Sequence, residues 1–92
     1  MRDGSISNNN GRGLEVKNSS AASAINLTIA DNATDGVALE KSLVSLRGTQ
    51  ITGNKGFGIV ADANSVVAGR DNVIATNATD MSENVPERIR KR

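Results

Sequence analysis

The stretch IADNATDGVAL, residues 29–39, has a related copy on each side of it in the chain. The first copy is ISNNNGRGLEV at residues 6–16, and the third is ITGNKGFGIVA at residues 51–61. A fourth Ile-x-x-Asn step occurs at Ile74 and Asn77, so successive steps are separated by 23, 22 and 23 residues. A period in the low twenties indicates a solenoid, in which each repeat forms one rung stacked on its neighbours.

Alignment of the repeats places residues of one kind in columns. A branched apolar residue follows each glycine of the repeat, and a second apolar residue follows two places later, which is typical of a short strand with one buried face. The predicted core column consists of Ile6, Ile29, Ile51 and Ile74. The predicted ladder column consists of Asn9, Asn32, Asn54 and Asn77. The predicted turn glycines are Gly13, Gly36 and Gly58, and a third strand-like patch follows the matching residues Ser19, Ser42 and Ser65.

The asparagine column has two interpretations. The amides can form a ladder at an inner turn, bonding to one another along the stack and to the backbone. Alternatively, each Asn serves only its own turn, because Asn tolerates left-handed backbone angles. We expect the glycine column to relieve the same left-handed strain.

The three repeats quoted above resemble the right-handed parallel β-helix of pectate-lyase-like proteins and of NosD-like periplasmic proteins. The resemblance covers residues 5–80 and implies an all-β solenoid of about three to four rungs, each of 22–23 residues. Residues 1–80 would form the rungs, and residues 81–92 a charged C-terminal tail or a short helical cap containing Val85 and Ile89. The resemblance favours an extracellular or cell-surface location, although the opening MRDGSIS lacks the apolar segment of a signal peptide.

A leucine-rich-repeat-like solenoid is the alternative fold. Residues 24–32 and 46–54 approximate the L-x-x-L-x-L-x-x-N template of that class. The template also requires an apolar residue two places after the Asn. This chain instead has Gly11, Thr34, Gly56 and Thr79 there.

Composition argues against several classes of function. Phe57 is the one aromatic residue and cysteine and histidine are absent, so thiolate or imidazole metal sites are excluded and we expect no cofactor. No apolar run is long enough to predict a membrane-spanning helix. The last stretch, MSENVPERIRKR, adds four basic and two acidic residues. Without stacking side chains, such a tail makes nucleic-acid binding an unfavoured interpretation.

Charged residues that align on outer faces are the candidate ligand-facing residues. Arg12 and Asp35 share one column with Phe57 and Asp80, and the neighbouring Arg12 and Asp35 form the best charged pair. Arg47 and Arg70 stack on successive rungs as a basic strip suited to a uronic acid or a phosphate. The simpler interpretation of all four is solubilising surface charge.

No catalytic residue is predicted. Pectate-lyase-like and polygalacturonase-like enzymes use acidic residues grouped on adjacent rungs. Asp31 and Asp35 have no acidic neighbours in their columns on the adjoining rungs. We therefore assign no catalytic, cofactor-binding or metal-binding residue to this chain.

These observations predict a short, non-catalytic β-helix module for recognition or scaffolding, facing a polysaccharide or belonging to a larger surface protein. One alternative is a fragment of a polysaccharide lyase, hydrolase or epimerase whose catalytic rungs lie outside this chain. Another is an oligomerisation module of an adhesin or phage fibre. Because a solenoid exposes strand edges at its ends, we expect self-association or further β-helix rungs as partners.

Overall fold

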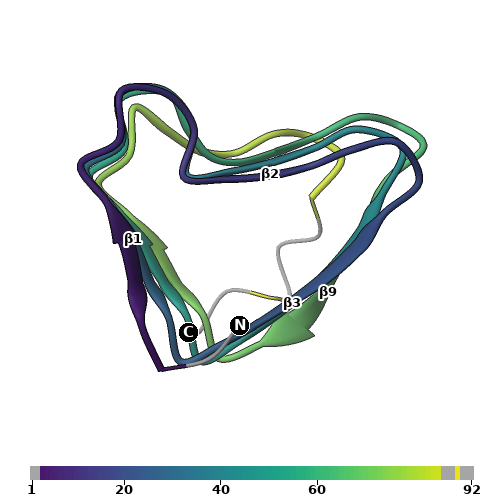
Figure 1. Cartoon of the computed structure of the whole chain (residues 1–92), viewed down its shortest axis with the longest axis horizontal. Coiled ribbons are helices and arrows are strands. Elements are labelled where there is room, and N and C mark those ends of the chain that lie inside the picture. Colours follow the sequence, from purple (N-terminus) through teal and green to yellow (C-terminus); the bar gives the residue numbers. More distant parts are fainter. Residues whose placement is uncertain (1–2, 86–88, 90–92) are drawn as a thin grey trace.

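The chain winds into stacked rungs of roughly triangular outline, with short parallel strands along the three sides (Figure 1). The computed structural model describes residues 3–85 and 89, and within them the regular elements are eleven strands with no α-helix. The first five strands are β1 (Ser5–Ser7), β2 (Leu14–Val16), β3 (Ala21–Ile25), β4 (Thr28–Ala30) and β5 (Val37–Leu39). Those that follow are β6 (Leu43–Arg47), β7 (Gln50–Thr52), β8 (Phe57–Ala61), β9 (Val66–Arg70), β10 (Val73–Ala75) and β11 (Thr79–Met81).

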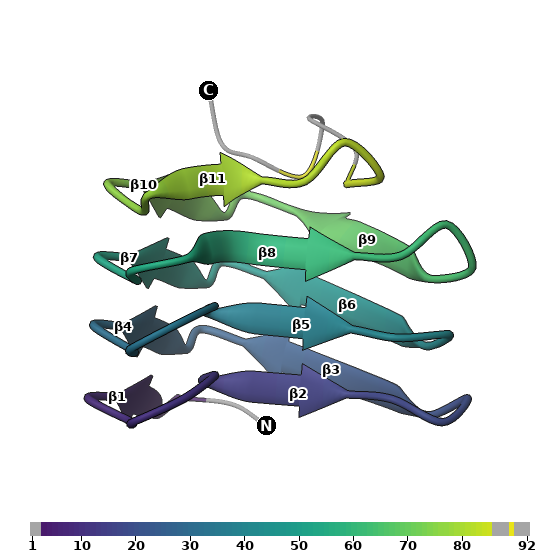
Figure 2. The same ribbon diagram turned by 90° about the horizontal axis from the view of Figure 1, so that it is seen from above.

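Each full rung contributes one strand to each of three parallel sheets. The sheet orders are β1-β4-β7-β10, β11-β8-β5-β2 and β3-β6-β9, so every pairing joins strands one rung apart (Figure 2). This arrangement of about three turns confirms the predicted all-β solenoid. The leucine-rich-repeat alternative is wrong, because each rung closes through three strands and no helix fills the convex side of the described chain.

The isoleucine column lies inside the stack. Ile6, Ile29, Ile51 and Ile74 are register partners in consecutive strands. Ile29 and Ile51 are fully buried, Ile74 is nearly so, and Ile6 at the first rung is half-buried. Burial of one such side chain contributes about 1.5–3 kcal/mol, and the column repeats that gain at each rung.

Two columns are shifted by one residue from their predicted alignment. The match of Ser19 with Ser42 would place Ala21 opposite Val44, but Ala22 stands there. Likewise, the backbone N–H of Ser20, not of Ser19, donates to Ser42 Oγ. The cause is turn length, because residues 17–20 precede β3 whereas only residues 40–42 precede β6.

The second shift is in the last strand. Thr79 pairs with Phe57 and Met81 pairs with Ile59. Thr79 therefore takes the place that the sequence assigned to Asp80 in the column of Arg12 and Asp35.

Left-handed residues mark the corners of the triangle. One corner has φ near +60° at Asn8, Asp31, Gly53 and Thr76. A second corner has similar angles at Asp3, Asn26, Gly48 and Asp71. Asn, Asp and Gly adopt this backbone region most readily, which accounts for most of the residue types in the two columns.

The predicted reason for the turn glycines is wrong, since Gly13, Gly36 and Gly58 all lie outside the left-handed region. Their requirement is steric. A Cβ on Gly36 would lie 2.7 Å from Asn54 Nδ2 and 2.7 Å from the carbonyl oxygen of Gly58. Glycine is needed here so that the asparagine side chain can pack against the backbone.

The asparagine column forms a continuous run of amide hydrogen bonds along the stack. Asn9 Nδ2 donates to Asn32 Oδ1 at 2.9 Å, Asn32 Nδ2 to Asn54 Oδ1 at 2.8 Å, and Asn54 Nδ2 to Asn77 Oδ1 at 2.8 Å. Each Oδ1 also accepts the backbone N–H of the asparagine in the rung before it. Asn32 and Asn54 are buried, so their polar atoms depend on these bonds.

The last rung is covered by residues beyond β11. Val85 and Ile89 are buried, and the Ile89 carbonyl oxygen accepts hydrogen bonds from Asn72 N at 3.2 Å and Asn72 Nδ2 at 3.0 Å. The predicted helical cap falls largely on residues 86–88 and 90–92, which lie outside the described residues.

Replacing Asn54 with Ala should destabilise the fold by about 3 kcal/mol. The buried N–H and side-chain amide of Asn32 and the Ile29 carbonyl lose this partner, and Asn77 Oδ1 loses one of its two donors. Urea unfolding followed by far-UV circular dichroism would measure the loss. Asn64→Ala is the matched control, since this exposed side chain lies outside the column. Equal midpoints for the two variants would contradict a stabilising role for the column.

Candidate functional site

The outer face of the β3-β6-β9 sheet is the most distinctive surface of the described chain. These strands are five residues long, and alternation along β6 turns Leu43, Ser45 and Arg47 outward while Val44 and Leu46 are buried. The parallel register repeats this order on the neighbouring strands.

The face consists of three rows that run along the stack. The apolar row contains Ala21, Leu43 and Val66, and the small row contains Ser23, Ser45 and Ala68. The basic row contains Ile25, Arg47 and Arg70. Leu43 and Val66 are 44% and 56% exposed, and they stand next to each other in this apolar row. The face therefore combines an apolar edge, a hydroxyl-bearing centre and a basic edge.

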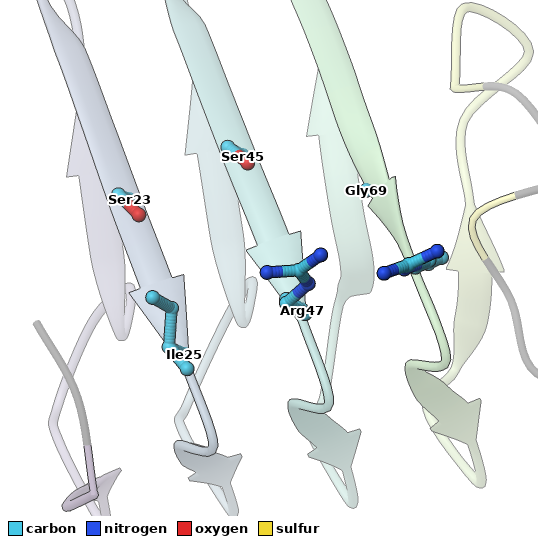
Figure 3. Close-up of a pocket in the computed structure, with 6 residues that line it drawn as sticks. Ser23, Ile25, Ser45, Arg47 and Gly69 are labelled. Carbon is cyan, nitrogen blue, oxygen red and sulfur yellow. The ribbon is translucent and has the colours of Figure 1, made fainter.

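A shallow groove of about 480 Å³ follows the small and basic rows. Its lining residues are Ser23, Ile25, Ser45, Arg47, Gly69 and Arg70. Figure 3 shows Ser23 and Ser45 on adjacent strands, with Ile25 and the Arg47 side chain farther along the same two strands. Gly69 must be glycine, because its φ is +138° and a Cβ would overlap the Leu46 carbonyl oxygen.

The two guanidinium groups of the groove are available to an external anion. Arg47 and Arg70 are exposed register partners, so their Cα atoms are about 4.8 Å apart, one strand spacing. Within residues 3–85 and 89, the ion pairs involve Arg12 and Lys17, and neither groove arginine has a carboxylate partner. A guanidinium binds carboxylate, sulfate or phosphate through two parallel N–H donors.

Arg12 and Asp35 lie on a different side of the molecule, beside the β2-β5 pair. Arg12 Nε donates to Asp35 Oδ2 at 3.1 Å and Arg12 Nη1 to Glu15 Oε2 at 2.6 Å. The hydrogen bond to Asp35, followed by that to Glu15, raises the pKa of Arg12. Asp35 Oδ1 also accepts the Phe57 backbone N–H at 2.9 Å. The chain itself thus satisfies this pair, whereas Arg47 and Arg70 face solvent.

The turn before β9 is held by Asp62. Its carboxylate accepts the Ser65 hydroxyl at 2.7 Å, the Asn64 backbone N–H at 3.1 Å and the Lys41 backbone N–H at 3.1 Å. These bonds, that of Ser65 first, lower the pKa of Asp62. The turn fixes where β9 begins and hence the position of Arg70 relative to Arg47.

Residues 3–85 and 89 contain no group of three or more acidic side chains arranged to hold a metal ion. Nor does that part of the chain contain a helix with the length and hydropathy needed to cross a bilayer. The groove lining includes no carboxylate, so it lacks the paired acids of glycoside hydrolysis.

Sequence analysis identified Arg47 and Arg70 but missed their neighbours. Ser23 and Ser45 line the groove, and Leu43 and Val66 form the apolar row on the same face of the sheet. The signal was present in LVSLR at residues 43–47, whose alternation places three different residue types on one face. The one-residue shift before β3 concealed the match to residues 21–25.

Comparison with known proteins agrees with this architecture. The family model described as "Right handed beta helix region" matches residues 1–83, and the chain belongs to that family. No curated protein and no solved structure matches the chain. The family defines a right-handed parallel β-helix and leaves the role of the face to be argued from its own residues.

Acid should weaken the turn before β9. Because the pKa of Asp62 is lowered in the folded chain, folding favours its ionised form and ionised Asp62 stabilises the fold. This stabilisation is complete above the ordinary pKa of Asp, and it is lost as the pH falls through the lowered pKa. We expect Asp62→Asn to flatten the acidic limb of a plot of unfolding free energy against pH. Asp71→Asn, at an exposed corner residue, is the control. An unchanged acidic limb in Asp62→Asn would contradict this role.

Proposed function

We propose that this chain is a non-catalytic β-helix recognition module whose β3-β6-β9 face binds an acidic polysaccharide. The observation that supports this proposal best is the pair of exposed arginines, Arg47 and Arg70, one rung apart along a groove and without a carboxylate partner among the described residues. A polyuronate laid parallel to the stack offers carboxylates at regular intervals, and each guanidinium can take one of them in bidentate fashion.

The remaining rows of the face suit a sugar chain as well. The hydroxyl of Ser45 can donate to or accept from sugar hydroxyls in the centre of the groove. The exposed side chains of Leu43 and Val66 can pack against the C–H faces of sugar rings. With two exposed ion pairs and no aromatic platform, binding should be weak for one molecule and sensitive to salt.

Polygalacturonate binding, measured by affinity electrophoresis or calorimetry, tests the proposal. The double variant Arg47→Ala/Arg70→Ala should bind about tenfold more weakly, because two exposed charge contacts together contribute roughly 1.4 kcal/mol. Lys17→Ala/Lys55→Ala removes the same net charge outside the groove and should bind like the unaltered chain. A neutral polysaccharide should bind to none of these proteins.

Several results would count against the proposal. Equal losses in both double variants would indicate general charge attraction rather than a site on this face. Appearance of unsaturated uronate absorbance during the incubation would replace the non-catalytic role with the lyase alternative. A neutral chain that binds as tightly as the polyuronate would exclude the arginines as the determinant.

We also propose that the chain associates with itself through the edges of its first rung. Strands β1, β2 and β3 each pair with only one described neighbour, and Ile6 and Leu14 beside those edges are only half-buried. Unpaired parallel edges with apolar neighbours favour strand addition by another chain. The opposite end is covered by Val85 and Ile89.

Sedimentation velocity over a range of protein concentrations tests this association. We expect the mean sedimentation coefficient to rise with concentration, because pairing of the edges would be a mass-action equilibrium. Ser7→Pro removes one backbone donor from the edge of β1 and should reduce the rise. A profile that remains monomeric at every concentration would end the proposal.

A further inference from the structure

The dipeptide Asn10–Gly11 lies at the exposed corner between β1 and β2 in the first rung. Asn followed by Gly is chemically labile, since a residue without Cβ lets its backbone nitrogen approach the preceding side-chain carbonyl carbon. Asparagine is among the thermolabile residues of proteins for this reason. Asn10 is the one asparagine of this sequence that precedes a glycine.

The backbone N–H of Gly11 differs from those at the matching place in later rungs. Thr34 N donates to Gly11 O at 3.3 Å, Gly56 N to Thr34 O at 2.7 Å, and Thr79 N to Gly56 O at 3.2 Å. Each of these nitrogens is held by the rung before it. Gly11 belongs to the first rung, and its nitrogen has no acceptor within the residues that the structure describes.

Other Asn and Asp residues are poorer candidates, because of their contacts or their chemistry. Asp35 precedes Gly36, but its carboxylate is held by Arg12 and by Phe57 N, and Gly36 N donates to Phe57 O at 2.9 Å. Asp3 precedes Gly4, but an ionised carboxylate is a poorer electrophile than an amide. The ladder residues Asn32, Asn54 and Asn77 are held through both side-chain atoms.

We propose that Asn10 is a site of spontaneous deamidation and isoaspartate formation. The Gly11 nitrogen attacks Asn10 Cγ and loses its proton, a new N–Cγ bond closes a five-membered succinimide, and the side-chain amide leaves as ammonia. Water then opens the ring. Hydrolysis at Cγ gives aspartate, and hydrolysis at the backbone carbonyl gives isoaspartate, in which the main chain runs through the former side chain.

The modification would alter the contact between the first two rungs. Ala33 N donates to Asn9 O at 3.0 Å and Thr34 N donates to Gly11 O, so bonds to the second rung lie on both sides of Asn10. Isoaspartate adds one carbon to the backbone between those acceptors and displaces at least one of them. Either product also brings a new carboxylate within two residues of Arg12, which already binds Asp35 and Glu15.

Prolonged incubation of the full chain at neutral pH, followed by peptide-level mass spectrometry and isoaspartate detection, tests the proposal. We expect residue 10 to change from amide to acid several-fold faster than the exposed residues Asn8, Asn18 and Asn64. Gly11→Ala is the matched variant. Nothing lies within 4 Å of a Cβ built on Gly11, so the variant should melt like the unaltered chain and deamidate several-fold more slowly.

Three results would overturn the proposal. Residue 10 could keep its amide while another asparagine is converted. The Gly11→Ala variant could react at the unaltered rate while its melting temperature is unchanged. The unaltered chain could also yield aspartate without isoaspartate, since ring opening of a succinimide produces both.

Discussion

The fold depends on one requirement, that the side-chain amides of the inner column asparagines, Asn32 and Asn54, find partners in both adjoining rungs. Asn54 is buried, accepts from Asn32 and donates to Asn77 and to the Ile29 carbonyl. Loss of any rung would leave buried polar groups unpaired, and each unpaired group would reduce the stability of the fold by about 1–3 kcal/mol. Gly36 is tied to the same requirement, because a side chain there would occupy the space of the amide. The Ile-x-x-Asn and Gly positions are therefore parts of one structural unit.

The three sheets divide structure and surface chemistry between them. The asparagine column lies at the corner between the β1 and β2 sheets, whose one exposed large apolar residue among the described residues is Val73. The β3-β6-β9 sheet has longer strands and carries the exposed Leu43, Val66, Arg47 and Arg70. Substitutions on that face change what the surface offers to a partner, while the column that supports the stack is untouched. This separation allows one scaffold to present different surfaces.

Sequence analysis predicted the solenoid, its period and the isoleucine column, because Ile, Asn and Gly recur at nearly constant spacing. It misplaced Ser19 and Asp80, since the turns before β3 and β11 differ in length from their counterparts and a one-residue difference moves every later column. It also gave the wrong reason for Gly36, because steric contact with Asn54 depends on a neighbour one rung away. The groove was predicted only through its two arginines. Its hydroxyl and apolar rows consist of common residues that become a surface only when the strands align.

The turns leading into the β3-β6-β9 sheet comprise residues 17–20, 40–42 and 62–65, so this corner already accepts changes in length. At the corner of the asparagine column, the segment from Ile to Asn admits none, as the two residues keep their three-residue separation in all four steps. The one length difference at this corner lies in the last rung, where the turn into β11 is a residue shorter than the turn into β8. We therefore expect inserted residues to be tolerated best in the turns leading into the β3-β6-β9 sheet, which lie at one edge of its outer face. A longer loop there would flank the groove and make it deeper, and it would leave the register of the stacked strands unchanged. In this β-helix, the place that tolerates added sequence is next to the surface where added sequence could change recognition.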